Sequence, residues 1–340
     1  MLNGKVILVT GGTGSFGQRF AHIVLGRYKP RKLIIFSRDE QKQFEMRRTF
    51  PPERFSNVRF FIGDVRDKDR LRRAFDGVDI VVHAAALKHV PTCEYDPIEA
   101  VKTNILGAAN VVEAALDCNV HRVIALSTDK AANPINLYGA TKLCSDKLFV
   151  AGNSYSGAHP TRFSVVRYGN VVGSRGSVIP HFMSMRTRGV VPITDPRMTR
   201  FMITLDDAVE FVISSLERMD GGEVFVPKLP SINIMDLAKA VAPDCKTEIV
   251  GIRPGEKLHE VMIPEDASRH TLEYGGHFAV MPSHESWTRK KRDGGRMCPE
   301  KFVYSSDRND HWLTVEELRR IVGSLVVNQR GIGEEQFLPI

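Results

Sequence analysis

A tyrosine and a lysine four residues apart, Tyr138 and Lys142, could carry acid–base chemistry. Residues at positions i and i+4 of a helix lie on one face, so the two side chains would be neighbours. A cation beside a phenol stabilises the phenolate and lowers the pKa of the phenol, which could then take a proton from a hydroxyl group. This spacing is common on surface helices, and it becomes informative only through its place in the chain.

Three polar residues, Thr128, Asp129 and Lys130, stand shortly before this tyrosine, at the end of an apolar run. The carboxyl end of a central strand is where α/β sheets place their ligands. An adjacent carboxyl group and amine could donate and remove protons, but a lysine base must be partly neutral, which requires burial or a nearby cation. The simpler alternative is a strand-end turn in which Asp129 acts as a cap.

A glycine-rich turn follows the first apolar run and precedes a helix pattern, with glycines at 11, 14 and 17. Glycines at this spacing permit a tight turn, let the backbone approach a pyrophosphate and let the helix pack closely on the strand. The phosphates would then meet free N–H groups at the helix N-terminus. We therefore predict a dinucleotide site that includes Gly11, Thr13, Gly14, Ser15, Phe16 and Gly17.

The end of the second apolar run distinguishes two forms of the dinucleotide. An acidic residue there binds the free ribose 2′-hydroxyl of NAD, whereas an arginine accommodates the 2′-phosphate of NADP. Ser37 stands at the position of the carboxylate and Arg38 follows it, which predicts NADP. The alternative is that Arg38 is a solvated charge at a helix start, with Asp39 as a nearby carboxylate. Further contacts with the dinucleotide are expected from Asp64, Val65, Ala84, Ala85, Ala86, Tyr138 and Lys142.

Short apolar runs that alternate with helix-length segments must position these residues. The expected strands are Val6–Val9, Leu33–Phe36, Val58–Phe61, Ile80–Val82, Val123–Leu126 and Phe163–Val166, and the helices between them include Phe16–Leu25, Ile98–Leu116 and Leu137–Val150. Strands separated by helices form βαβ units, and uncharged β-branched strands are typical of a sheet covered on both faces. The fold class is therefore α/β, with a Rossmann-type doubly wound parallel sheet.

The pattern becomes less regular after Tyr168. We expect a loop at Gly169–Pro180, helices near His181–Thr187 and Leu205–Leu216, a strand at Glu223–Val226 and a loop-rich segment at 265–300. The predicted cofactor domain spans residues 1–170, with 200–230 returning to it. Residues 171–199 and 231–330 are predicted to form a smaller, discontinuous, mixed α/β substrate domain.

The composition is that of an ordinary soluble protein, with 340 residues of which 42% are hydrophobic and 26% charged. The net charge of +7 is mild, and the basic run Arg289-Lys290-Lys291-Arg292 is more typical of a solvated loop than of a nucleic-acid site. No apolar run is long enough for a membrane span, and the first residues lack the pattern of a signal peptide. We expect neither a nucleic acid nor a membrane as partner.

The five cysteines are scattered, odd in number and without a CxxC pair. This pattern favours neither a disulfide framework nor a zinc site, so no metal is expected. Free thiols in a chain of this kind are typical of the reducing cytoplasm, where we expect the protein to act.

Several longer runs carry a resemblance to a known family. They are Ala84 to Lys88, Ser127 to Lys147, Arg162 to Val178, Pro192 to Arg200, Gly251 to Lys257, Tyr304 to Asp307 and His311 to Leu313. Over nearly its whole length the chain resembles the extended short-chain dehydrogenase/reductases. More narrowly, it is similar to the bacterial inverting UDP-N-acetylglucosamine 4,6-dehydratases, which open the route to pseudaminic acid.

The resemblance implies roles for the residues after the fifth strand. Most sugar-nucleotide 4,6-dehydratases carry Thr-Asp-Glu there, whereas this chain has Thr128-Asp129-Lys130, as in the inverting group. Lys130 would remove the C5 proton and Asp129 would protonate the departing C6 hydroxyl. Tyr138, with Lys142, would deprotonate the C4 hydroxyl while hydride passes to NADP⁺, and the hydride would return to C6. The implied product is UDP-2-acetamido-2,6-dideoxy-β-L-arabino-hex-4-ulose.

The resemblance also implies a set of residues that bind UDP-N-acetylglucosamine. Arginines among them suit the diphosphate because the guanidinium fork matches phosphate oxygens. The implied set is Lys88, Thr128, Asn170, Ser177, Val178, Ile193, Thr194, Arg200, Arg253 and Glu256. A homo-oligomer is expected, of a size that the sequence does not give.

Four other functions remain to be weighed. A dehydratase that retains the C5 configuration is the nearest, because one lysine does not determine the face of reprotonation. A UDP-hexose 4-epimerase would use the same tyrosine and cofactor but needs no acid–base pair for C5 and C6, so Asp129 and Lys130 argue against it. A cofactor-sensing regulator would lack Tyr138 or Lys142, and a nucleic-acid-binding role depends on the 289–292 run alone.

Overall fold

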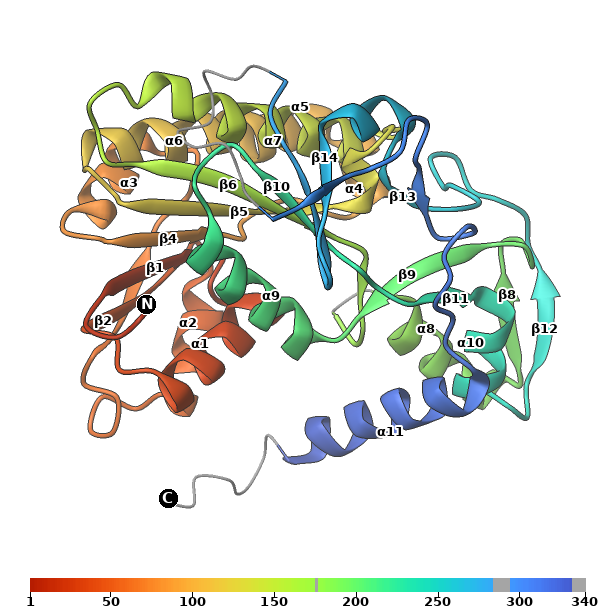
Figure 1. Ribbon diagram of the computed structural model, residues 1–340. Helices are drawn as coiled ribbons and strands as arrows, with labels where there is room; N and C mark the ends of the chain where they lie inside the picture. The colour runs from red at the N-terminus through yellow and green to blue at the C-terminus, as the bar shows by residue number, and fades with distance from the viewer. Residues whose placement is uncertain (175–176, 284–293, 332–340) are drawn as a thin grey trace. The chain divides into compact units, whose positions relative to one another are not determined.

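The computed structural model describes residues 1–174, 177–283 and 294–331 (Figure 1). The basic run at 289–292 lies outside the described residues. The chain forms two compact units. Unit 1 comprises Met1–Tyr168, Asp206–Lys228 and Val261–Tyr304, and unit 2 comprises Gly169–Leu205, Leu229–Glu260 and Ser305–Ile340.

Unit 1 is built on a ten-stranded sheet in the order β16-β14-β15-β10-β6-β5-β4-β1-β2-β3. Its strands are β1 (Val6–Thr10), β2 (Lys32–Ser37), β3 (Val58–Ile62), β4 (Ile80–His83), β5 (Arg122–Thr128), β6 (Arg162–Tyr168), β10 (Val224–Pro227), β14 (Thr271–Glu273), β15 (His277–Val280) and β16 (Arg296–Met297). The pairs from β3 to β10 are parallel. The chain reverses direction across the sheet between β1 and β4, which is where such folds bind dinucleotides.

Helices cover both faces of this sheet, with α3, α5, α6 and α7 on one side and α1, α2 and α9 on the other (Figure 1). They are α1 (Ser15–Arg27), α2 (Glu40–Thr49), α3 (Lys68–Phe75), α4 (Val90–Tyr95), α5 (Pro97–Val101), α6 (Gly107–Asp117), α7 (Leu137–Tyr155) and α9 (Leu205–Arg218). Every residue of β1 and β4 is buried, as expected for strands between two helical layers. The structure confirms the predicted Rossmann-type α/β class and all six expected strands.

Beyond β10, the structure differs from two expectations, on the loop-rich segment 265–300 and on the domain to which residues 261–304 belong. The segment 265–300, predicted to be loop-rich, contributes β14, β15 and β16, which extend the sheet in antiparallel pairs beyond β10. Residues 261–304, assigned above to the substrate domain, belong to unit 1. These strands are two to four residues long, and β14 and β16 carry polar or charged side chains, so neither shows the apolar run that marks a central strand. The returning segment, expected at 200–230, is Asp206–Lys228.

A π-helical turn, Lys102–Leu106, interrupts the helix expected at Ile98–Leu116. It lies between α5 and α6, so the long helix bulges where Asn104 is buried. Turns of this kind often mark functional sites. The apolar spacing of the segment does not distinguish a π turn from a continuous α-helix.

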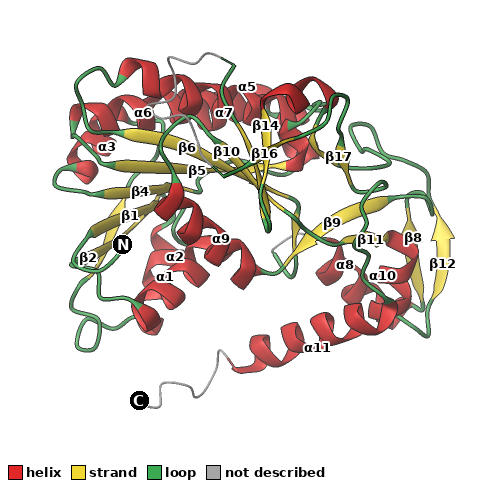
Figure 2. Cartoon of the chain, viewed as in Figure 1, coloured by secondary structure: helices red, strands yellow, loops and turns green. Residues whose placement is uncertain are grey.

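Unit 2 combines small sheets with helices (Figure 2). The strands are β7 (Asn170–Val171), β8 (Val190–Ile193), β9 (Thr199–Ile203), β11 (Ser231–Asn233) and β12 (Lys246–Ile249), and the helices are α8 (Val178–Met185), α10 (Ile234–Val241) and α11 (Val315–Gly331). Strands β11, β9 and β7 form one sheet, and β12 pairs with β8. Two further short strands, β13 (Val261–Ile263) and β17 (Tyr304–Ser305), lie near the points where the chain passes between units.

The core of unit 2 is a hydrophobic cluster to which the three helices and the strands contribute. Ile193, Leu237 and Leu318 are completely buried in it. Helix α8 begins at Val178, earlier than the predicted start near His181, and β7 lies within the predicted loop. Val178 starts the helix because Ser177 before it has the extended backbone of an N-cap.

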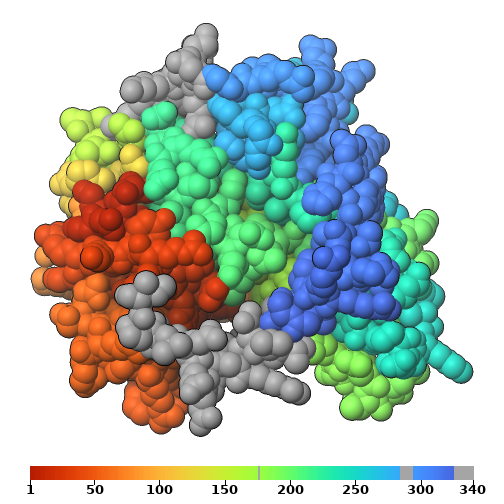
Figure 3. Space-filling model, turned by 60° about the horizontal axis from the view of Figure 1, so that its bottom comes forward, coloured from red at the N-terminus to blue at the C-terminus, as the bar shows by residue number. Residues whose placement is uncertain are grey.

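Helix α9 returns the chain to unit 1 and packs near α1, where the green residues meet the red N-terminal ones (Figure 3). Arg19 pairs with Asp206, and Arg27 pairs with Glu210. All five cysteines are free thiols. Among the described residues, no helix is both long and apolar enough to cross a membrane.

Candidate active site

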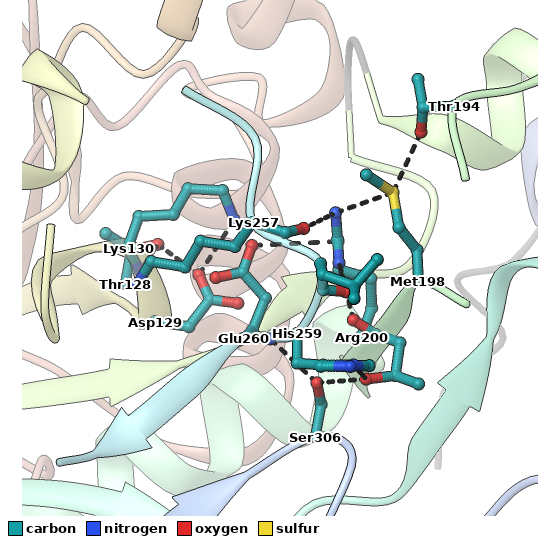
Figure 4. Close-up of polar contacts among 12 residues, drawn as sticks. Thr128, Asp129, Lys130, Thr194, Met198, Arg200, Lys257, His259, Glu260 and Ser306 are labelled. Carbon is teal, nitrogen blue, oxygen red and sulfur yellow. Dashed lines mark hydrogen bonds and ion pairs between the residues drawn. The ribbon is translucent and has the colours of Figure 1, made fainter. Parts of the chain in front are cut away.

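The turn after β5 brings an acid and an amine together (Figure 4). Thr128 ends the strand, and Asp129–Ala131 form a single 3-10 turn. The Nζ of Lys130 lies 3.0 Å from Oδ1 of Asp129, and the hydroxyl of Thr128 donates to the same oxygen at 2.8 Å. Asp129 is 1% exposed. The N-cap of this turn is Thr128, whose side-chain oxygen accepts from the Lys130 amide.

Helix α7 places Tyr138 beside this turn. Asn136 caps the helix by accepting a hydrogen bond from the Gly139 amide at 2.8 Å. Gly139 packs so closely that a Cβ atom there would lie 2.2 Å from the carbonyl oxygen of Lys130. The pKa of the Tyr138 phenol responds to Lys130, Thr128 and Asp129, so these three side chains lie close to it. The structure thus brings together Thr128, Asp129, Lys130 and Tyr138, as the sequence predicted.

The electrostatics of Tyr138 differ from the expectation. Burial raises the pKa of the Tyr138 phenol to about 12, against the charge of Lys130 and the hydrogen bond from Thr128, which lower it. The cation that acts on the phenol is therefore Lys130, where the spacing had suggested Lys142. A buried phenol loses solvation of its charged form, and a cation one helical turn away does not compensate for that loss.

Lys142 lies on the same helix and is 4% exposed. Burial lowers the pKa of its ammonium group, and the charge of Asp146 opposes this shift. His83 at the end of β4 is buried as well, and burial together with the charge of Lys142 lowers its pKa to about 3. The neutral ring of His83 is hydrogen-bonded through Nδ1 to the hydroxyl of Thr10 at 2.8 Å.

Asn104, which we did not predict as a site residue, connects two predicted segments. Its amide group pairs with the backbone of Leu87, accepting from the N–H at 2.8 Å and donating to the carbonyl at 2.9 Å. It also donates to the hydroxyl of Thr141, which in turn donates to the carbonyl of Tyr138. Asn104 is 2% exposed and lies in the π-helical turn. The segment holds several other polar residues, such as Glu99 and Asn110, so its sequence does not single out Asn104.

The glycine-rich turn has the geometry that close backbone approach requires. Gly11 has a φ of +64°, and a Cβ atom there would lie 2.8 Å from the amide nitrogen of Ala85. A Cβ atom at Gly17 would lie 2.4 Å from the carbonyl oxygen of Gly12. Gly14 is the N-cap of α1, with no side-chain cap and no acidic residue in the first turn. The free N–H groups of this helix start are suited to a pyrophosphate.

The end of β2 lies beside this turn, because the hydroxyls of Thr13 and Ser37 are 2.8 Å apart. Asp39 caps α2 by accepting from the Lys42 amide, and its carboxylate also pairs with the Lys42 ammonium group. Arg38 is largely exposed and lies 3.7 Å from Asp64. The carboxylate of Asp39, the alternative partner for the ribose of NAD, therefore caps α2, whereas the side chain of Arg38 is largely exposed.

Asp64 and the alanines after β4 complete the predicted dinucleotide set. Partial burial would raise the pKa of Asp64, but the hydrogen bonds and charge of Arg66 outweigh it, so the pKa is lowered. Val65 is buried, whereas Ala84, Ala85 and Ala86 are only partly so. Gly11 packs directly against the backbone of Ala84 and Ala85, so the glycine-rich turn and the end of β4 lie side by side. The residues present therefore fit a nicotinamide dinucleotide.

The residues that the resemblance implies for the UDP group, Asn170, Ser177, Val178, Ile193, Thr194, Arg200, Arg253 and Glu256, all lie in unit 2. Arg200 on β9 is largely committed to the protein itself (Figure 4). Its guanidinium donates to the carbonyls of Thr199, Leu258 and Lys257 at 2.7–3.0 Å, and its Nε lies 3.8 Å from Glu260. The arginine thus holds the 257–260 segment in place.

The other members of this set vary in exposure. Arg253 is exposed, and its amide donates to the Glu256 carboxylate across a turn at 3.3 Å. The hydroxyl of Ser177 is buried without a hydrogen-bond partner among the described residues, and Thr194 donates to the sulfur of Met198. Lys88 lies in unit 1, where partial desolvation lowers the pKa of its ammonium group.

Comparisons with known proteins agree with this geometry. Residues 7–282 match the model of a family described as polysaccharide biosynthesis protein. A UDP-N-acetylglucosamine 4,6-dehydratase (inverting) from Campylobacter jejuni subsp. jejuni serotype O:23/36 (strain 81-176) is 54% identical over 332 residues, covering 95% of this chain and 98% of the relative. A UDP-glucose 4-epimerase from Rickettsia akari (strain Hartford) is 42% identical over 335 residues, covering 94% and 96%.

Among solved structures, the X-ray structure of Pen from Bacillus thuringiensis superimposes with a TM-score of 0.87 at 37% identity, covering 97% of this chain and 99% of that one. The likeness therefore extends over both units. The chain belongs to the polysaccharide biosynthesis protein family, within the extended short-chain dehydrogenase/reductases.

Proposed function

We propose that the protein is an NADP-dependent UDP-N-acetylglucosamine 4,6-dehydratase that inverts the configuration at C5. The C. jejuni relative of that name is 54% identical over nearly the whole of both chains. Its product would be the L-arabino 4-keto-6-deoxy sugar, consumed in pseudaminic acid synthesis. We further propose that the enzyme acts in the cytoplasm as a homo-oligomer, as the resemblance implies.

The pair formed by Asp129 and Lys130 is the single observation that supports this proposal most strongly. Elimination of water across C5 and C6 requires a base at C5 and an acid at the C6 hydroxyl. The two side chains are 3.0 Å apart, and they follow the strand that leads to Tyr138. Oxidation and reduction at C4 alone would need only the tyrosine.

Movement of one proton within this pair can produce both the base and the acid that the elimination requires. Transfer of a proton from Nζ of Lys130 to Oδ1 of Asp129 yields a neutral amine and a protonated carboxyl group together. Burial of Asp129 favours this neutral form relative to water, because separated charges lose solvation. Lys130 could then take the C5 proton while Asp129 protonates the leaving hydroxyl group, which restores the charged forms of both side chains.

Tyr138 would act first, by removing the proton of the C4 hydroxyl. Bound NADP⁺ would supply the hydride acceptor for C4 and, once reduced, the hydride donor for C6. Lys130 lowers the pKa of the phenol and so assists this step before it acts as a base. The hydroxyl of Thr128 donates its proton to Asp129, which holds that carboxyl group beside Lys130.

Product analysis tests the proposal directly. The purified protein is incubated with UDP-N-acetylglucosamine and NADP⁺ in deuterated water, and the product is identified by NMR. We expect a 6-deoxy-4-keto sugar with the L-arabino configuration, solvent deuterium at C5 and the former C4 hydrogen at C6. A product that retains the original C5 hydrogen would overturn the role of Lys130, and a D-configured product would identify a retaining dehydratase.

The 42% identical Rickettsia relative named as a UDP-glucose 4-epimerase supports a second candidate function. An epimerase would convert UDP-glucose or UDP-N-acetylglucosamine to the C4 epimer without loss of water. The same NMR experiment separates the two activities, because an epimerised product keeps its C6 hydroxyl group. We favour the dehydratase because an epimerase has no use for the acid–base pair at 129 and 130.

A further inference from the structure

His259 is a polar residue of unit 2 to which the proposed reaction assigns no role. It lies between the Gly251–Lys257 run and β13, and its side chain is partly exposed. Nδ1 of the ring lies 2.8 Å from the hydroxyl oxygen of Thr199 on β9. That oxygen lies in turn 2.7 Å from the hydroxyl oxygen of Ser306, so the three side chains form one hydrogen-bonded chain (Figure 4).

The direction of this chain follows from the protons that its members carry. The hydroxyl of Ser306, which is completely buried, accepts a hydrogen bond from the Glu260 amide at 2.9 Å. Its own proton therefore goes to the oxygen of Thr199, its remaining side-chain partner among the described residues. Thr199 then donates its proton to Nδ1 of His259. A neutral ring that accepts at Nδ1 carries its proton on Nε2.

The backbone on both sides of His259 is held in place. The carbonyl of Leu258 accepts from the Thr199 amide at 3.1 Å, and the carbonyl of Glu260 accepts from the Ser306 amide at 2.8 Å. The ring therefore has a fixed orientation relative to β9. No residue that the structure describes accepts a hydrogen bond from Nε2, so this donor is available to a ligand.

Contacts within unit 2 connect His259 to a residue that the resemblance implies for UDP. The hydroxyl of Thr194 donates to the sulfur of Met198 at 2.9 Å, and Met198 immediately precedes Thr199. A neutral N–H group supplies direction without charge, which suits the uncharged carbonyl and hydroxyl oxygens of a nucleoside. The diphosphate is better matched by a guanidinium group such as that of Arg253.

We propose that His259 binds the uridine part of UDP, and that Thr199 and Ser306 hold its ring as the Nε2–H tautomer, which donates to a carbonyl or hydroxyl oxygen of the nucleoside. The inference rests on the proposed function, because it takes a UDP-sugar as the substrate. His259 contributes to the affinity for the nucleotide and acts on none of the reacting atoms. Thr199 and Ser306 are positioning residues, because they act through the ring.

Two substitutions separate the roles of the ring nitrogens. In His259→Asn the amide oxygen can still accept from Thr199, as Nδ1 does, but no donor reaches the position of Nε2. The Kd for UDP, measured by calorimetry, should rise by about 3–10-fold, which is the effect of losing one hydrogen bond. In His259→Gln the amide N–H group reaches the position of Nε2, so more of the affinity should be kept. Wild-type affinity in His259→Asn, or a loss in His259→Gln at least as large, would overturn the proposal.

Comparison of two ligands locates the acceptor. Uridine monophosphate and UDP share the nucleoside, so His259→Asn should weaken both by the same factor. A loss confined to UDP would place the donor at the diphosphate and overturn the assignment to uridine. His311→Asn, which changes an exposed histidine of the same unit, is the matched control and should leave both affinities unchanged. Urea unfolding of each variant separates loss of affinity from loss of folding.

Nitrogen chemical shifts of the histidine ring, measured by NMR, test the tautomer without turnover. The free protein should show His259 as the Nε2–H form, and UDP should shift the Nε2–H signal and slow its exchange with water. In Thr199→Val, which cannot donate to Nδ1, the shifts should move toward those of the Nδ1–H form. A wild-type ring that carries its proton on Nδ1, or an Nε2–H signal that UDP does not affect, would overturn the proposal.

The same measurements distinguish failure of this inference from failure of the proposed function. A wild-type protein that does not bind UDP would contradict the proposed substrate itself. Binding of UDP that is unaltered in His259→Asn would remove only the role given to His259.

Discussion

Lys130 has two neighbours that define its chemistry at the scale of single residues. It donates to Asp129 at 3.0 Å, and its charge lowers the pKa of Tyr138 against the effect of burial. One side chain therefore influences both oxidation at C4 and proton removal at C5. Variants at this position should affect the two half-reactions differently.

Removal of the amine should separate oxidation from elimination. We expect Lys130→Ala to oxidise C4 but to stop before loss of water, because no base remains for the C5 proton. NADPH and a bound 4-keto sugar should accumulate, visible as absorbance of the reduced nicotinamide, with little 6-deoxy product by NMR. Lys130→Glu should recover some elimination, since a carboxylate is a competent base, without efficient inversion. Wild-type elimination in Lys130→Ala would contradict this role.

The phenol of Tyr138 predicts a pH dependence for the oxidation step. With a pKa of about 12 in the ligand-free protein, the phenolate is scarce at neutral pH and increases as pH rises. Single-turnover reduction of NADP⁺ should therefore accelerate with pH in the wild type. In Lys130→Ala the pKa loses the lowering effect of the cation, so the acceleration should begin at higher pH.

Tyr138→Phe provides the matched control for that experiment. It keeps the ring and removes the proton acceptor, so kcat should fall by roughly 10²–10⁴ with substrate affinity largely kept. The residual rate should be insensitive to pH across the range in which the wild type accelerates. Near-normal turnover would place the hydroxyl-proton acceptor elsewhere in the protein.

At the scale of elements, the contact between α7 and the turn after β5 sets the geometry of the site. Gly139 makes that contact possible, since a Cβ atom would lie 2.2 Å from the carbonyl oxygen of Lys130. The sequence Tyr138-Gly139 is therefore more constrained than the four-residue spacing to Lys142 suggests. This constraint depends on backbone that is close in space, so spacing alone does not reveal it.

Gly139→Ala should separate the first turn of α7 from Lys130. We expect a loss of about 1–3 kcal/mol in the free energy of unfolding and a larger proportional loss of kcat, because Tyr138 moves with the helix. Gly26→Ala is the matched control, since it lies in α1 with no atom within 4 Å of the added Cβ, and should gain about 0.5–1 kcal/mol. Urea unfolding and steady-state kinetics on both variants measure the difference. Equal behaviour of the two would show that the contact is unimportant.

Strands β1 to β6 were predictable from sequence, whereas the short strands beyond β10 were not. Strands such as β1 and β4 are buried on both faces, so their uncharged runs indicate strands without knowledge of neighbours. The short strands β14 and β16 become strands through pairing partners that no local pattern identifies. The same reason explains the missed Asn104, whose place in the site depends on its contacts with Leu87.

At the scale of the whole molecule, the residues predicted to bind the cofactor and the UDP group belong to different units. The glycine turn, Ser37 and Arg38 lie in unit 1, whereas Arg200, Arg253 and Glu256 lie in unit 2. The sequence indicated this division through the break in regularity after Tyr168. It did not indicate that residues 261–304 return to unit 1, because the pairing of β15 with β10 joins segments some fifty residues apart.

The division predicts two variants with complementary defects. Arg38→Ala should weaken NADP⁺ binding, because it removes the cation proposed for the 2′-phosphate, and should leave NAD⁺ and UDP binding unchanged. Arg253→Ala should raise the KM for UDP-N-acetylglucosamine and leave NADP⁺ binding unchanged. Titrations of each ligand against each variant measure the effects. Equal wild-type affinity for NADP⁺ and NAD⁺, unaltered in Arg38→Ala, would refute the assignment of NADP.

The order of the segments in unit 1 has a consequence for biosynthesis. A ribosome that has completed Tyr168 has delivered the six central parallel strands, and the outer edge of β6 then has no partner until β10 is made at Val224–Pro227. An open edge of this kind is a site for pairing with other nascent chains. Chaperone occupancy during translation should therefore be greatest between these two points and fall once β10 and β15 have emerged.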